Sequence, residues 1–100
     1  MRDDVIYLVA KDYDTNKYGV LVPSAKKRKV YCKETSVSAS EWFEGSRAGL
    51  NPEYRFKMFP PDYKGEDTIE YKGKLYSIYR TFERDADTIE LYVERKKGAL

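Results

Sequence analysis

The sequence predicts a mostly β protein: a small closed or nearly closed antiparallel barrel or sandwich of about six strands, with one short inserted helix. The last third of the chain supports this most strongly, because residues 67–96 form three extended segments separated by two short turns. Lys72-Gly73 supplies a residue that tolerates positive φ in a tight hairpin, and residues 84–87 supply the second turn. In residues 89–94 apolar side chains alternate with Glu and Tyr, which is the period of a half-buried strand.

Size and composition indicate one folded domain that covers residues 1–100 and buries a modest core. Charged residues make up 36% and aromatic residues 15% of the chain, and a content of 10 Tyr suits a β protein with amphipathic surfaces. A net charge of +2 is too small to indicate nucleic-acid binding by itself. No apolar run approaches the roughly 20 residues of a membrane span. The N-terminus lacks the pattern of a signal peptide, and the single Cys32 excludes an internal disulfide. We therefore expect a soluble intracellular domain without a membrane partner.

Two strands are predicted in the first third of the chain. Residues 5–10 are apolar on both alternating faces, so this strand is either covered on both sides or keeps one face for a partner chain. Residues 12–19 are rich in Asp, Asn and Gly and are expected to form a turn or loop. A short extension at 20–22 precedes Pro23, and residues 26–29 lead into the second strand, in which apolar and polar side chains alternate over residues 30–33.

A short helix is predicted over residues 38–48. Ser38 and Glu41 have the spacing of a capping box, and Gly49 is placed to end the helix in left-handed geometry. Trp42 and Phe43 form its apolar side. They either face the core or anchor an interface or gate, and the sequence leaves both alternatives open.

The residue types and spacings that support catalysis or metal binding are mostly missing. The chain has no His and one Cys, which excludes Ser–His triads, His-based zinc sites and CxxC pairs. Residues 12–16 begin like a calcium loop, but Lys17 and Pro23 occupy the positions that require Gly and Glu, so an Asx-stabilised hairpin turn is expected. The carboxylate pairs Glu66/Asp67 and Asp85/Asp87 lie in predicted turns. We predict no catalytic residue, no cofactor and no metal.

Nucleic-acid contacts have one candidate segment. The dense basic run consists of Lys26, Lys27, Arg28 and Lys29. These side chains either face a DNA backbone, where clustered cations release counterions, or form a solvated strand entrance. A third predicted strand, over residues 54–58 and ended by Pro60-Pro61, places its rings and its charges on opposite faces, so it does not form a base-stacking platform.

Several segments taken together resemble one protein family. They are residues 36–50, 52–59, 63–66, 70–81 and 89–95. Their order is a capped helix, a Pro-Glu-Tyr strand, a Tyr-x-Gly-Glu turn and a Tyr-x-Gly-x-x-Tyr-x-Ile hairpin. This succession, over roughly residues 12–97, resembles the head–tail joining proteins of long-tailed bacteriophages and prophages of Gram-positive bacteria, also called head-closure, stopper or adaptor proteins.

The resemblance implies a small β-barrel whose copies assemble as a ring, expected to be a dodecamer, beneath the portal and its adaptor. Such a ring closes the DNA exit channel after packaging and docks the tail. Its implied partners are the portal–adaptor ring, tail proteins, other copies of the chain and the packaged DNA. Its implied location is the head–tail junction of the virion, with the host cytoplasm as the place of assembly. The family has no invariant catalytic residue to transfer. A tail-completion ring protein and a small monomeric β-barrel that binds nucleic acid remain alternatives.

Overall fold

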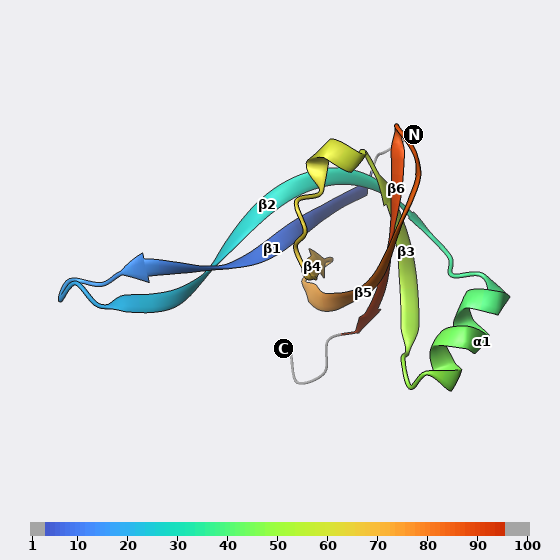
Figure 1. Cartoon of the computed structure of the whole chain (residues 1–100), viewed down its shortest axis with the longest axis horizontal. Helices are drawn as coiled ribbons and strands as arrows, with labels where there is room; N and C mark the ends of the chain where they lie inside the picture. The colour runs from blue at the N-terminus through green and yellow to red at the C-terminus, as the bar shows by residue number, and fades with distance from the viewer. Residues whose placement is uncertain (1–3, 96–100) are drawn as a thin grey trace.

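The computed structural model describes residues 4–95, apart from the side chain of Asp12. It contains six strands, one α-helix and one 3₁₀ helix, which are β1 (Asp4–Thr15), β2 (Leu21–Thr35), α1 (Ala39–Arg47), β3 (Pro52–Met58), η1 (Pro60–Asp62), β4 (Thr68–Tyr71), β5 (Lys74–Asp85) and β6 (Thr88–Arg95). All neighbouring strands are antiparallel and close a barrel in the order β1-β2-β3-β6-β5-β4. The predicted fold class is confirmed (Figure 1).

The barrel interior is filled by inward-facing side chains from all six strands. Strand alternation explains the selection, since Phe56 and Met58 of β3 and Leu91 and Val93 of β6 each lie two residues apart and are fully buried. Tyr54 packs edge-on against Tyr71 and Tyr76 and extends this cluster. The buried core consists of Ile6, Leu8, Val30, Cys32, Phe56, Met58, Ile69, Tyr71, Tyr76, Ile89, Leu91 and Val93.

The closing meander has the turns that the sequence predicts. Lys72 and Gly73 have φ of 51° and 78°, which are the positive values that a two-residue hairpin between twisted strands requires. The β5–β6 turn lies at residues 86–87. Here local residue chemistry and the final structure agree, and the pairing of β4, β5 and β6 is short-range in sequence.

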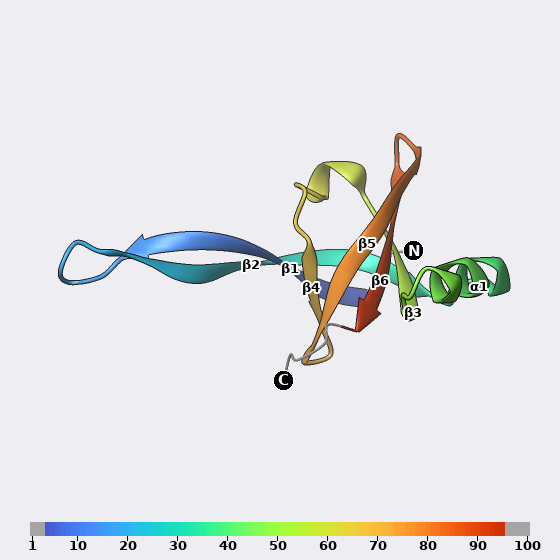
Figure 2. The same cartoon turned by 60° about the horizontal axis from the view of Figure 1, so that its bottom comes forward.

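The β1–β2 hairpin is much longer than predicted, and part of it leaves the barrel. β1 runs to Thr15 and β2 begins at Leu21, so the expected loop over residues 12–19 is wrong and the turn is only five residues long. Pairing of β1 with β4 ends at Val9, whereas the pairing of β1 with β2 continues to the turn. Residues 10–26 therefore project as a two-stranded ribbon, here called the arm (Figures 1 and 2).

Pro23 lies inside β2, opposite Tyr13, and does not separate a short extension from a second strand as expected. The arm has only two strands, so each strand has an open edge, and an edge is where a sheet tolerates a residue without an N–H. The sequence signal for a strand break was therefore misleading at this position.

The helix begins and ends where the sequence predicts, within one residue. The Ser38 hydroxyl accepts a hydrogen bond from the Glu41 N–H at 3.2 Å, and Gly49 follows the helix with φ 84°. The expected capping box is incomplete, because the Glu41 carboxylate is directed to β5 and accepts hydrogen bonds from Tyr79 and Arg80. Within residues 4–95, no helix is long and apolar enough to cross a membrane.

Candidate interaction surfaces

The polar residues that the sequence offered as possible ligands or catalysts serve local turns. The Asn16 side chain accepts hydrogen bonds from the backbone N–H groups of Tyr18 and Val20, at 2.9 and 3.1 Å, as expected for an Asx-stabilised turn. The Asp85 carboxylate likewise accepts from the Asp87 N–H at 2.9 Å. In the part of the chain that the structure describes, no three His, Cys, Asp or Glu side chains gather closely enough to hold a metal ion.

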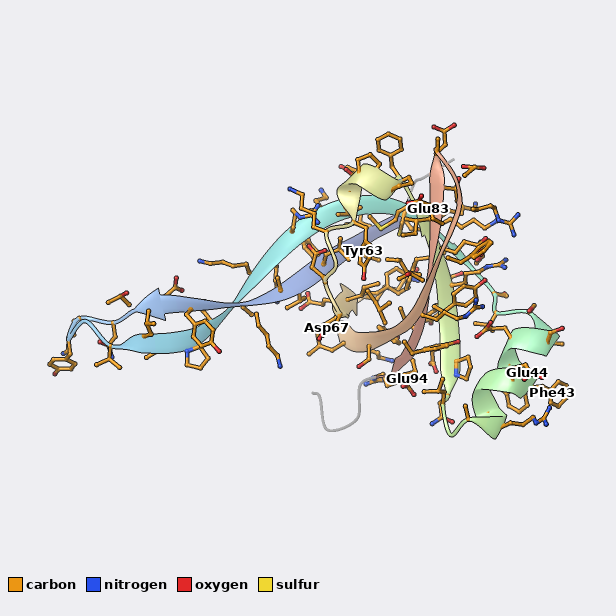
Figure 3. The ribbon with its side chains drawn as sticks, viewed as in Figure 1. Phe43, Glu44, Tyr63, Asp67, Glu83 and Glu94 are labelled. Atoms are coloured by element: carbon orange, nitrogen blue, oxygen red, sulfur yellow. The ribbon has the colours of Figure 1, made fainter. Side chains whose placement is uncertain are left out.

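A partly buried ion pair ties β2 to the loop before β4. Arg28 Nη2 lies 2.7 Å from Glu66 Oε2, and the Glu66 side chain is only 7% exposed. Burial by itself raises the pKa of the Glu66 carboxyl, but the hydrogen bond from Arg28 and those from backbone N–H groups outweigh it and hold the pKa below its usual value. Tyr63 donates its hydroxyl to the Glu66 carbonyl at 2.7 Å, and Figure 3 shows Tyr63 and Asp67 on this loop. Glu66 and Asp67 thus lie in a structural loop.

Helix α1 exposes its large apolar side chains. Trp42 is 50% and Phe43 60% exposed, and their rings meet edge-on with centroids 5.4 Å apart. Gly45 is the buried residue of this helix. The core-facing alternative is therefore wrong for these two aromatic residues, and Figure 3 shows Phe43 directed away from the barrel. An exposed aromatic pair is the composition expected of an interface anchor.

The helix is attached to the barrel by a few specific contacts. A Cβ at Gly45 would lie 2.5 Å from Pro52 Cγ, so only glycine fits at this contact between α1 and β3. Glu41 accepts a hydrogen bond from the Tyr79 hydroxyl at 2.8 Å and pairs with Arg80. Burial, followed by the bond to Glu41, raises the pKa of the Tyr79 hydroxyl, so this residue remains a donor at physiological pH.

A shallow pocket lies between α1 and β5. Its volume is about 420 Å³, and most of its exposed lining is apolar. Ala48, Leu50 and Tyr79 form apolar walls, while Glu41 and Glu44 add carboxylates. Figure 3 shows Glu44 on the outer part of the helix. A second hollow of about 230 Å³ at the base of the arm has a mainly charged lining, which includes Lys11, Lys64, Glu66 and Asp67.

Three of the four residues in the predicted DNA-facing run are paired with carboxylates of the same chain. Lys26 lies 3.4 Å from Asp14, Lys27 lies 2.7 Å from Glu70, and Arg28 pairs with Glu66. Lys29 lies over the Tyr31 ring at 5.3 Å. Their positive charge is thus largely compensated within the fold, which reduces what the run can offer to phosphate.

The outer face of the β1–β2 sheet combines rings and cations that the sequence analysis did not bring together. Tyr7 lies opposite Lys29, Val5 opposite Tyr31 and Val9 opposite Lys27, so all six side chains belong to one face. Tyr31 is 55% and Tyr7 38% exposed. The i, i+2, i+4 spacing of Lys27, Lys29 and Tyr31 could have predicted that they share one face of a strand. The presence of Tyr7 on that face depends on the pairing register of β1 with β2, which the sequence does not reveal. Residues 5–10 are therefore not covered on both sides, and a partner chain on the exposed face stays a prediction.

Comparison with known proteins supports the fold and is silent on activity. No protein-family model matches the chain, and no curated protein matches it. The solution structure of protein SF1141 from Shigella flexneri 2a, a structural-genomics target, is similar to it with a TM-score of 0.71. The match covers 97% of this chain and 95% of that protein at 14% sequence identity. At this identity the likeness shows a shared fold alone.

Proposed function

We propose that this protein is a structural phage protein that forms a ring at the head–tail junction, closes the DNA exit channel after packaging and docks the tail. The observation that carries the proposal is the distribution of exposed apolar side chains. Among the described residues, the four most exposed large apolar side chains are Tyr18, Leu21 and Tyr13 on the arm and Phe43 on α1, and these two elements lie at opposite ends of the molecule (Figure 1). Large apolar side chains at two remote extremities of a small barrel are costly in water unless other proteins cover them.

The shape supports assembly into a ring. Two different surfaces at opposite ends of a subunit form head-to-tail contacts, and such contacts close into rings when the rotation between neighbours allows it. The longest dimension of the described chain is 51 Å, compared with 30 and 21 Å for the others. The sequence resemblance to head–tail joining proteins supplies the specific location and partners: the portal–adaptor ring on one side, the tail on the other and DNA in the channel. The proposed role is structural and includes no enzymatic step.

Deletion of the gene from the phage or prophage that carries it tests the proposal. We expect DNA-filled heads without tails, heads that have lost their DNA, and free tails, all counted by electron microscopy after induction. Expression of the wild-type chain in trans should restore complete virions. Normal numbers of intact, infectious virions from the deletion strain would contradict the proposal. Complete heads that accumulate with defective tail ends would instead favour a tail-completion ring protein.

A small nucleic-acid-binding module is the second candidate, and the Tyr7–Tyr31 face with Lys27 and Lys29 favours it. Rings for stacking and cations for the backbone on one sheet face are typical of single-strand binders. Fluorescence anisotropy with labelled single-stranded oligonucleotides tests it, with Tyr7→Ser/Tyr31→Ser as the variant and Phe43→Ser, a change of an exposed aromatic residue on α1, as the control. Micromolar binding that the double variant abolishes would establish this alternative.

The basic run has its own test in the same assay. Under the head–tail proposal we expect at most weak, sequence-independent DNA binding. The change of Lys26, Lys27, Arg28 and Lys29 to Ser should then flatten its dependence on salt. If the affinity of the fourfold variant for DNA depends on salt as strongly as that of the wild type, these four side chains do not contact DNA and are only solvent-exposed.

A further inference from the structure

The end of the arm carries an exposed aromatic group on a fixed turn. Tyr18 is 77% exposed, and Lys17 Nζ lies 5.1 Å from the centroid of its ring. The turn itself is held by the Asn16 side chain and by Gly19, whose φ is 76°. Because the turn is ordered in advance, little conformational entropy is lost when Tyr18 enters a partner surface.

The apolar surface continues along one face of the arm. Tyr13 pairs with Pro23 and Thr15 pairs with Leu21, and strand alternation places these four side chains on the same face. Leu21 is 67% and Tyr13 63% exposed. These exposed side chains and Tyr18 belong to a ribbon that projects from the barrel (Figure 2). The described residues of the barrel do not cover this end of the arm.

The pocket between α1 and β5 is complementary in size and charge to the tip of the arm. Its apolar walls accept a ring, and its volume of about 420 Å³ exceeds what one phenol side chain occupies. The Glu44 carboxylate at its edge is 73% exposed, and Arg47 approaches it at 3.4 Å on the solvent side of the helix. A Lys beside an inserted ring would reach this exposed carboxylate in addition to Arg47, whereas the Glu41 side chain is only 14% exposed and is paired with Arg80.

We propose that Tyr18 at the arm tip of one copy inserts into the pocket between α1 and β5 of the next copy, with Lys17 facing Glu44. The proposal rests on the ring assembly proposed above and names the contact between neighbours. The two surfaces lie at opposite ends of the chain (Figures 1 and 2), so one molecule cannot satisfy both, and each copy is left with a free arm and a free pocket for its neighbours. The contact is head-to-tail, as a closed ring requires.

Paramagnetic broadening between two separately prepared samples tests the contact. One sample carries a nitroxide on Arg47→Cys, an exposed helix position that is not part of the pocket lining. The other is ¹⁵N-labelled wild-type chain, whose arm is intact. At a total concentration of about 1 mM, even a millimolar contact is measurably populated. We expect selective broadening of the amide signals of residues 16–19 in the labelled chain.

Two controls make the result specific. A nitroxide on Ala86→Cys, in the exposed β5–β6 turn, should leave the arm-tip signals unchanged. The ¹⁵N-labelled Tyr18→Ser variant, which keeps the Asn16 turn, should lose at least most of the broadening caused by the Arg47→Cys label. Absence of selective broadening, or equal broadening in Tyr18→Ser, would overturn the proposal.

The outcome is separable from that of the deletion experiment. Broadening at the arm tip in a protein whose deletion leaves virions intact would support the contact between copies and refute the head–tail role. A deletion phenotype without broadening would support the role and assign the arm to another partner, such as the portal–adaptor ring. Broadening of residues 5–9 and 27–31 in place of the arm tip would place the contact on the outer sheet face and would also overturn the proposal.

Discussion

At the scale of single residues, Cys32 is a core side chain whose thiol is chemically protected. It is fully buried on β2, and its burial, followed by the carboxylates of Asp4 and Glu34, raises the pKa of its thiol to about 12. Since the thiolate is the reactive form, the folded protein holds Cys32 almost entirely as the inert thiol.

We expect Cys32 to resist a thiol reagent such as Ellman's reagent at about pH 8, where an ordinary cysteine is substantially reactive. In denaturant the same residue should react stoichiometrically, because both burial and the neighbouring carboxylates are lost. The absorbance of the released thiolate, recorded with and without denaturant, measures this. Rapid stoichiometric reaction of the folded protein would show that β2 does not bury Cys32 as described.

Glu66 predicts a dependence of stability on pH. Its folded pKa lies below the unfolded value, so its stabilising contribution is complete above the ordinary carboxyl pKa, about 4.3, and is lost as pH falls through the folded value. Glu66→Gln should reduce the free energy of unfolding by about 1–3 kcal/mol at neutral pH, because Arg28 loses a charged hydrogen-bond partner.

Denaturant titrations of wild type and Glu66→Gln at about pH 7 and about pH 3 measure the effect, since the pH interval brackets the carboxyl pKa. The difference between the two proteins should shrink at the lower pH. Asp62→Asn, which removes a carboxylate on η1 without touching the Arg28–Glu66 pair, is the matched control for the loss of one negative charge. An equal Glu66→Gln effect at both pH values would refute this electrostatic account of the loop.

At the scale of elements, local residue chemistry predicted the meander and the helix well. Gly73 at a two-residue turn, Ser38 at a helix start and Gly49 at its end each specify a backbone conformation by themselves. The arm was missed for the opposite reason. Residues 10–26 have no core to face, so they lack the alternation that reveals a half-buried strand, and their Asp, Asn and Pro residues read as a loop.

The site residues were predictable only in part, because contacts between elements depend on register and orientation. The sequence singled out Trp42 and Phe43 but not their direction, which is set by the small Gly45 that packs on Pro52. It singled out the basic run but not its carboxylate partners on residues 14, 66 and 70, which lie far away in sequence. The Tyr7–Tyr31 face likewise requires the pairing of β1 with β2.

The few contacts that attach α1 to the barrel predict that this helix opens more readily than the strands. A helix of nine residues is marginal without packing, and α1 rests on the Gly45–Pro52 contact and the bonds of Glu41. Under the proposed role at the head–tail junction, the protein would need an element that can shift to seal a channel and later release DNA. We expect amide exchange in residues 38–49 of the isolated protein to be much faster than in residues 88–95, measured by NMR or mass spectrometry. Equal protection of the two segments would show that α1 is a fixed part of the fold and not a mobile gate.

At the scale of the whole molecule, the small subunit limits association between free copies. Under the proposed contact, each copy would give its arm tip to one neighbour and its shallow pocket to the other, and interfaces well below about 1,000 Å² are seldom stable alone. On a portal–adaptor template, simultaneous docking raises the effective concentration of neighbouring copies without any new contact. The ring is therefore expected to form on the template and not in free solution.

Analytical ultracentrifugation of the purified chain at low micromolar concentration checks this expectation. We expect a monomer, with weak association only as the concentration rises toward the millimolar range used for the paramagnetic experiment. A tight closed ring in the absence of any template would contradict the argument from interface size, although it would agree with a ring-forming role.

The most direct measurement of the central claim is a cryo-electron microscopy reconstruction of the head–tail junction of the virion whose genome encodes this chain. The account predicts a ring of copies of this barrel between the portal–adaptor assembly and the tail, across the DNA channel, with each arm directed toward a neighbouring copy. A junction completed by other proteins, with this chain absent from the particle or confined to another part of it, would contradict the account.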